Sequence, residues 1–163
     1  GDPGGALNDI LAQRDPRRQV TVRLGADRLA IGKDKLDLTV TSSHAGHLYL
    51  ILLGSDNRSF YLLFPNDRDH ANTIQAGETL RLPRTGWRIT AQGPAGVDRV
   101  LAVVAESPRN LALLGNERAG PFLQSLTDAN GRARLSWIMG TAMCGEAKCS
   151  DAYGAALVDI TEQ

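Results

Sequence analysis

The sequence predicts a mainly β protein: an immunoglobulin-like antiparallel β-sandwich with one or two short helices in its N- and C-terminal flanks. Apolar and polar residues alternate over 20–24 and 36–42, as they do in strands with one buried face. Longer apolar runs at 47–55 and 99–107 fit strands covered on both faces. Turn signals separate these runs about every 8–12 residues. A length of 163 residues favours one domain.

Residues 1–19 predict a linker that contains one short helix. Leu7, Ile10 and Leu11 have helical spacing after a Gly- and Pro-rich start, and Pro16 ends the helix. Residues 20–163 then form the single sandwich domain. The chain opens with GDPGG and has no initiator methionine, which indicates a piece of a longer protein. We expect the missing part to carry an export signal or a membrane anchor.

The middle of the chain predicts a series of strands. The turn cluster at 55–59 joins the run at 47–55 to a strand at 60–64, so the two form a β-hairpin. Further strands follow at 79–82 and 87–90, and the strand at 99–107 ends before a proline.

Beyond Pro108 the pattern changes. Phe122, Leu123 and Leu126 have helical spacing, so 121–126 predicts a helix that begins at Pro121. The Asn130-Gly131 pair predicts a stop or turn, 134–143 fits a helix or a strand, and 153–160 predicts a final strand. We expect both tryptophans, Trp87 and Trp137, to lie in the core.

The central segment resembles a bacterial domain of unknown function, family 4384, over about residues 35–108. A G-x-x-Y-L strand, an L-x-P-N strand end, an I-x-A-G turn, a proline strand end and a G-P-x-G-x-D loop occur in that order. The matching residues are Gly46, Tyr49, Leu50, Leu63, Pro65, Asn66, Ile74, Ala76, Gly77, Pro83, Gly93, Pro94, Gly96 and Asp98. Such domains are attached to bacterial serine/threonine protein kinases and caspase-like peptidases, some of them linked to type VI secretion. For a kinase, the resemblance implies a location outside the cytoplasm.

Two loops carry most of the candidate binding residues, because they join rigid strands and concentrate polar groups. The loops are 66–72 and 93–98, and the candidates are Asn66, Asp67, Asp69, His70, Gly93, Pro94, Gly96 and Asp98. The Asp- and His-containing segment NDRDHAN could also form a small metal or anion site, but an ordinary polar loop explains it better. No motif predicts a cofactor or a catalytic residue.

The only cysteines, Cys144 and Cys149, predict a disulfide and an oxidising compartment. Two unpaired, buried thiols are the alternative. Basic and acidic residues balance at 18 each, which argues against a nucleic-acid partner. No apolar run is long enough to cross a bilayer, so a membrane is expected only through an anchor in the parent protein.

These observations predict a non-catalytic recognition or sensor domain in the periplasm or elsewhere outside the cytoplasm. It would belong to a larger membrane-anchored bacterial signalling protein, for which a serine/threonine protein kinase fits best, and would contact a protein partner or a cell-envelope ligand. The main alternative is a structural or protein-interaction module of a type VI secretion system. A hydrolase is a lesser alternative, because it needs His44 or His70 beside a serine and an acid in one cleft.

Overall fold

The structure is a computed structural model that describes residues 2–142 and 148–163. Its helices are α1 (Pro3–Ala12) and α2 (Ala129–Gly140), with a 3-10 turn, η1, at Leu111–Leu114. The strands are β1 (Val20–Leu24), β2 (Arg28–Leu29), β3 (Leu38–Ser42), β4 (Gly46–Leu53), β5 (Ser59–Phe64), β6 (Thr73–Ile74), β7 (Thr79–Leu82), β8 (Gly96–Ala105), β9 (Arg118–Ala119), β10 (Phe122–Leu126) and β11 (Tyr153–Glu162).

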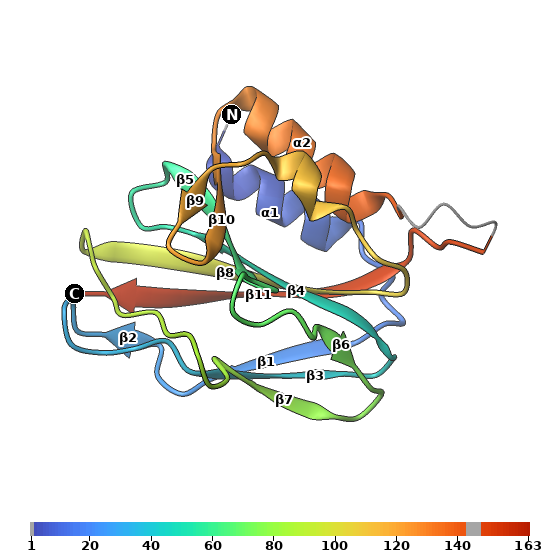
Figure 1. Ribbon diagram of the computed structural model, residues 1–163, viewed down its shortest axis with the longest axis horizontal. Coiled ribbons are helices and arrows are strands. Elements are labelled where there is room, and N and C mark those ends of the chain that lie inside the picture. Colours follow the sequence, from blue (N-terminus) through green and yellow to red (C-terminus); the bar gives the residue numbers. More distant parts are fainter. Residues whose placement is uncertain (1, 143–147) are drawn as a thin grey trace.

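The strands form two sheets, and neither closes into a barrel (Figure 1). The larger, 8-stranded sheet has the order β2-β11-β8-β4-β5-β10-β9, with β6 paired to β4. The smaller, 3-stranded sheet has the order β1-β3-β7. Neighbouring strands are antiparallel except β2 and β11, which run parallel.

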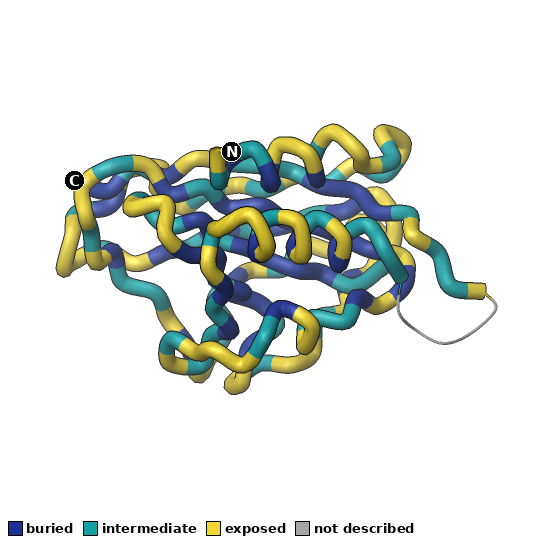
Figure 2. The backbone as a smooth tube through the Cα atoms, turned by 90° about the horizontal axis from the view of Figure 1, so that it is seen from above, coloured by how far each residue is buried: buried dark blue, intermediate teal, exposed yellow. Residues whose placement is uncertain are grey.

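The molecule has three layers: helices α1 and α2, the larger sheet, and the smaller sheet on the opposite face (Figure 1). The larger sheet therefore contributes to two apolar cores. Figure 2 shows that the buried stretches run through its central strands, whereas the helices expose their outer turns.

Strand β4 explains why the larger sheet can be covered twice. Tyr49 and Ile51 face the helices, whereas Leu48 and Leu50 face the smaller sheet. A strand with apolar side chains on both faces is stable only where both faces exclude water. This confirms the expectation that 47–55 is a strand covered on both faces.

The mainly β class is confirmed, and so are the strands expected near 20–24, 36–42, 47–55, 60–64, 79–82, 99–107 and 153–160. The immunoglobulin-like type stays a prediction, as does the division into 1–19 and 20–163. The expected N-terminal helix is present as α1, which buries Leu7 and Ile10 against the larger sheet. Neither helix in the described chain has the length and apolar character of a bilayer-spanning segment.

The helix expected at 121–126 is wrong, because residues 122–126 form strand β10. Leu123 pairs with Leu62 of β5 and packs in the core beneath the helices, whereas Phe122 packs in the core between the sheets. Apolar residues at positions one and four apart fit either structure. Pairing with the edge of β5 satisfies the backbone hydrogen-bonding groups of this segment. This pairing favours a strand over a helix.

Three further expectations for the chain are wrong. Asn130 and Gly131 do not stop a helix but lie in the first turn of α2, where the Gly131 N–H donates to the Asp128 carboxylate at 2.8 Å. Residues 87–90 do not form a strand, because only Thr90 makes a bridge, to Lys35. Trp137 is 52% exposed on α2 and is not a core residue.

Arg109 is buried, has no carboxylate partner among residues 2–142 and 148–163, and joins three separate parts of the chain. Its guanidinium donates to the carbonyl groups of Met139 (2.8 Å), Ser107 (2.8 Å), Ser150 (3.1 Å) and Asp151 (2.6 Å). These bonds tie the end of α2 and the segment before β11 to the end of β8. They supply a charged donor to four backbone carbonyl groups at this end of the molecule.

We expect Arg109→Ala to lower the free energy of unfolding by about 3 kcal/mol, because it removes several charge-assisted hydrogen bonds at once. Arg134→Ala, at an exposed position of α2, is the control and should change it by less than about 0.5 kcal/mol. Urea denaturation measures both variants. Equal stability of the two would contradict this role for Arg109.

Candidate functional site

The first predicted loop, 66–72, is held mainly by its own hydrogen bonds. The Asn66 side chain is buried; it donates to the Leu63 carbonyl at 2.8 Å and accepts the Arg68 N–H at 2.9 Å. Asp67 forms an exposed ion pair with Arg118 at 3.3 Å. His70 is exposed. No group of three or more His, Cys, Asp or Glu side chains within residues 2–142 and 148–163 could hold a metal ion.

Asp69 organises the next segment of the chain rather than an open site. Its carboxylate accepts from the Arg84 guanidinium at 2.6 and 2.9 Å and from the Trp87 Nε1–H at 3.0 Å. Burial opposes ionisation of this carboxyl, but the hydrogen bonds from Arg84 and Trp87 outweigh it and hold the pKa of Asp69 below its usual value.

Asp69 thereby fixes a group of stacked rings. Trp87 stacks on Phe64 with the ring centroids 6.2 Å apart, and it meets Phe122 edge-on at 5.8 Å. The Arg84 guanidinium lies 5.1 Å from the centre of the Phe64 ring. Phe122 in turn lines a cleft, so the loop supports the wall of that cleft without entering it.

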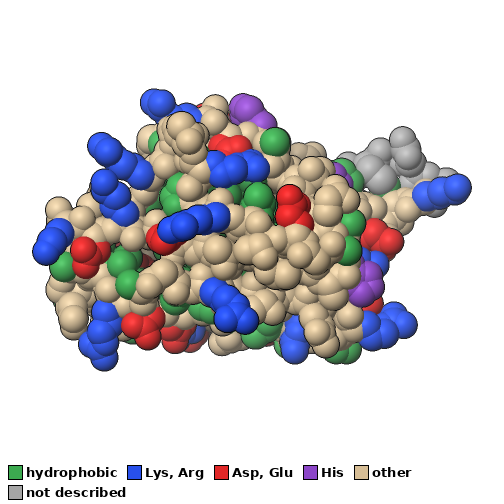
Figure 3. Space-filling view, turned by 90° about the horizontal axis from the view of Figure 1, so that it is seen from below, with side chains coloured by type: hydrophobic (Ala, Val, Ile, Leu, Met, Phe, Trp, Pro, Cys, Tyr) green, Lys and Arg blue, Asp and Glu red, His purple; other side chains and the backbone are tan. Residues whose placement is uncertain are grey.

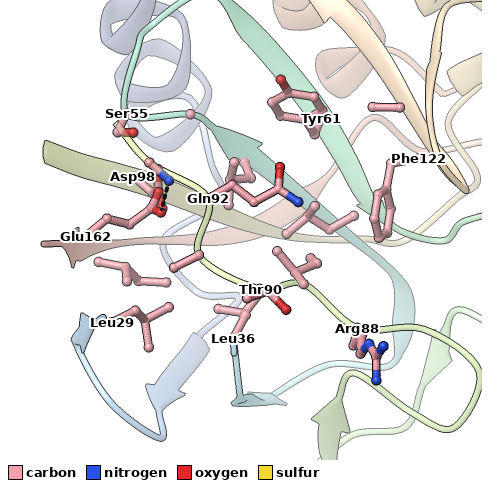
Figure 4. A pocket seen from close by; sticks show the side chains of 18 of the residues that line it. Leu29, Leu36, Ser55, Tyr61, Arg88, Thr90, Gln92, Asp98, Phe122 and Glu162 are labelled. Carbon is pink, nitrogen blue, oxygen red and sulfur yellow. Dashed lines mark hydrogen bonds between the residues drawn. The ribbon is translucent and has the colours of Figure 1, made fainter. Parts of the chain in front are cut away.

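The cleft has a volume of about 540 Å³ and is the candidate functional site (Figure 4). Its floor is the face of the larger sheet that the smaller sheet leaves uncovered, with Leu52, Tyr61, Leu63 and Ile160. Segment 88–93 and the turn at 119–122 form its walls. Most of the lining is apolar, with polar groups from Arg88, Thr90 and Gln92 along one wall.

Asp98 and Glu162 close one end of the cleft, where Figure 4 shows them side by side. In the register of β8 and β11, Asp98 lies opposite Ile160, and Glu162 follows two residues later on the same face. Asp98 is only 6% exposed and Glu162 only 5%. The Gly93 N–H donates to the Glu162 carboxylate at 2.9 Å.

Burial beside Glu162 perturbs the ionisation of Asp98. Burial and then the hydrogen bond with Glu162 raise the pKa of Asp98 to about 8, and the nearby charge of Asp56 acts in the same direction. A carboxyl group with this pKa holds its proton at neutral pH, which suits the hydrogen bond between Asp98 and Glu162. A hydrogen bond between two carboxyl groups allows both side chains to be buried together in an apolar setting.

The second predicted loop, 93–98, does reach this site. Gly93 and Asp98 line the cleft, and Pro94 accepts a hydrogen bond from the Ser55 hydroxyl at 2.7 Å. Gly96 begins β8 at φ +153. The structure thus brings Asp98 and Gly93 to the cleft but leaves Asn66, Asp67, Asp69 and His70 outside its lining.

Sequence reasoning missed Glu162, Arg88, Tyr61 and Phe122 as site residues. For Glu162 a signal existed: it continues the inward-facing row of β11 two residues after Ile160, where an apolar residue is expected. An acidic residue in such a row is unusual unless it is paired. Phe122 was missed because its segment was interpreted as a helix.

The histidine of the serine cluster lies away from the cleft. The Ser43 hydroxyl is 2.8 Å from His44 Nδ1 at an exposed position before β4. Neither His44 nor His70 is among the described residues that line the cleft. Cys144 lies outside the described residues, so the predicted Cys144–Cys149 disulfide stays a prediction.

Figure 3 shows basic and acidic side chains interspersed over the face seen from below. No area of a single charge dominates that face, in keeping with the equal totals of 18 basic and 18 acidic residues.

In comparisons with known proteins, residues 28–108 match the model of a family described as a domain of unknown function (DUF4384). The match begins seven residues before the resemblance expected from the sequence and ends at the same residue. The search of curated proteins found no match to the chain. Asp98 lies inside the matched segment, whereas Glu162 and Phe122 lie outside it.

We expect Asp69→Ala to lower the free energy of unfolding by about 1–3 kcal/mol, since it leaves the Trp87 N–H without its acceptor and leaves Arg84 with only the Ala71 carbonyl. The neighbouring exposed substitution His70→Ala should change it by less than about 0.5 kcal/mol. Thermal or urea unfolding compares the two. A larger loss for His70→Ala would show that the loop is organised differently.

We expect the stability of the protein to fall as pH rises from about 4 to about 8, because native Asp98 retains a proton that the unfolded chain releases. One such group contributes at most about 1.4 kcal/mol per pH unit. Asp98→Asn should remove this contribution and flatten the pH dependence of the free energy of unfolding.

Asp159→Asn, at an exposed position of the same strand as Glu162, is the matched control and should keep the slope. Urea denaturation at a series of pH values measures all three proteins. An unchanged slope in Asp98→Asn would mean that Asp98 ionises normally in the native state.

Proposed function

The chain belongs to the DUF4384 family of domains of unknown function, through residues 28–108, and from this premise we propose that it is a non-catalytic recognition domain whose ligand binds in the cleft. The observation that carries the proposal is the cleft itself. About 540 Å³ lies within the usual range of small-molecule sites, and an apolar lining with a few convergent polar groups is typical of them.

The chemistry of the lining supports binding rather than catalysis. Among the described residues, the lining contains no histidine that could act as a general base at neutral pH. Its serine, Ser55, donates its hydroxyl hydrogen to the Pro94 carbonyl at 2.7 Å, so this hydrogen is directed at the backbone and not at a base. Asp98 and Glu162 contact each other and present only a small part of their carboxyl groups to the cleft.

The proposal extends to the setting of the domain. We propose that it lies outside the cytoplasm and serves a larger, membrane-anchored bacterial signalling protein, with a serine/threonine protein kinase as the first candidate. The resemblance to kinase-attached domains and the pair of cysteines support this setting. In a type VI secretion system, the alternative setting, an exposed strand edge rather than the cleft would make the main contact.

A fragment screen followed by NMR tests the binding function. We expect bound fragments to shift the backbone signals of cleft residues such as Tyr61, Thr90 and Gln92. Gln92→Trp should abolish these shifts, because the indole ring fills the cleft from its exposed rim.

Gln75→Trp is the matched control, since Gln75 is an exposed glutamine outside the cleft lining, and it should leave fragment binding unchanged. Fragments that bind only along strand edges, or bind Gln92→Trp as well as the unsubstituted protein, would overturn the proposal.

A further inference from the structure

We propose that the ligand of the cleft is a short peptide with free ends, bound as an added strand alongside residues 88–92 with its N-terminal ammonium group at Asp98 and Glu162. This inference rests on the proposed recognition function and names the class of ligand. Three features carry it: the two ends of the cleft differ in charge, one wall has free backbone groups, and the floor is apolar.

The ends of the cleft suit the two ends of a peptide. At one end, Asp98 and Glu162 have Asp56 as a further acidic neighbour, and all three line the cleft. At the other end, Arg88 is exposed, and its side chain makes no hydrogen bond or ion pair with the described residues. An ammonium group fits the acidic end, and a carboxylate fits Arg88, whose guanidinium can bind both oxygens.

The wall between these ends can pair with a peptide backbone. On one side of the wall, the Leu36 N–H donates to the Ile89 carbonyl and the Ala91 N–H donates to the Asp34 carbonyl, both at 2.9 Å. Successive backbone groups of an extended chain point in opposite directions, so the N–H and C=O of Thr90 point away from residues 34–36. Within the described residues, neither group has a hydrogen-bond partner.

The direction of pairing agrees with the charges. The wall runs from Arg88 toward Gly93, which lies at the Glu162 end (Figure 4). A peptide whose N-terminus lies at Glu162 and whose C-terminus lies at Arg88 runs antiparallel to the wall. Antiparallel pairing is the more stable arrangement, and addition of a strand at an exposed edge is a common mode of peptide recognition.

The length and the floor of the cleft limit the peptide further. Residues 88–92 span at most about 13 Å when extended, which corresponds to a peptide of about four residues. Every second side chain of such a strand faces the floor, which Leu52, Leu63 and Ile160 make apolar. The preferred peptide therefore has apolar residues at alternate positions.

The probe that tests this inference is the tetrapeptide leucyl-alanyl-leucyl-alanine with free ends, measured by isothermal titration calorimetry at pH 7. N-acetylation of the peptide should weaken binding at least about 10-fold, because it removes the ammonium charge. Methylation of the interior amide that pairs with Thr90 should weaken binding by a similar factor, whereas methylation of the next amide should not. These changes leave the protein unaltered, so they cannot act through its folding.

Substitutions in the protein test the same contacts. Arg88→Gln should weaken binding of the free peptide about 5–10-fold and leave binding of the C-terminal amide unchanged. Arg68→Gln, at an exposed arginine outside the cleft, is the matched control and should have no effect. Equal binding of the free and the acetylated peptides, or no binding at millimolar concentration, would overturn the peptide proposal.

The outcome also separates this inference from the broader function. If fragments bind in the cleft and Gln92→Trp blocks them, but the tetrapeptide does not bind, the cleft recognises a ligand of another class and only the peptide inference fails. If neither the fragments nor the tetrapeptide bind there, both proposals fail.

Discussion

Burial of the larger sheet on both faces is the constraint on which the rest of the structure depends. In β8, Leu101 and Val103 pack under the helices, whereas Val100 and Ala102 pack against the smaller sheet. Both faces of β8 are apolar, so the helices are needed on one face and the smaller sheet on the other. Without either of them, a row of apolar side chains would be exposed to water. The helices and the smaller sheet are therefore joined through the sheet that they share.

The cleft forms where the smaller sheet no longer covers the larger sheet. The smaller sheet has three strands and leaves part of the wider sheet to irregular segments, which approach the floor less closely than a packed strand would. At the same place, Asp98 and Glu162 replace apolar residues in the inward-facing rows of β8 and β11. The apolar core is interrupted at these two residues, and the cleft therefore has both apolar and acidic surface.

The strands could be predicted because their signal is local. Alternation in 20–24 and continuous apolar runs in 47–55 and 99–107 reflect burial directly. The segment 121–126 could not be predicted, because its spacing suits two structures and the edge of β5 makes the choice. For the site, Asp98 was found from a polar loop, but its partner Glu162 lies 64 residues later in the sequence. Only the pairing of β8 with β11 brings the two carboxyl groups together.

The position of β11 has a consequence for the limits of the folding unit. It lies between β2 and β8, which both belong to the segment 28–108, yet β11 itself comes from the far end of the chain. A fragment cut to the family match would have a gap in the middle of its sheet and a long, apolar β8 with one unpaired edge, which favours aggregation. The matched segment therefore omits a strand that the larger sheet pairs on both sides, and completing this sheet requires the last strand of the chain.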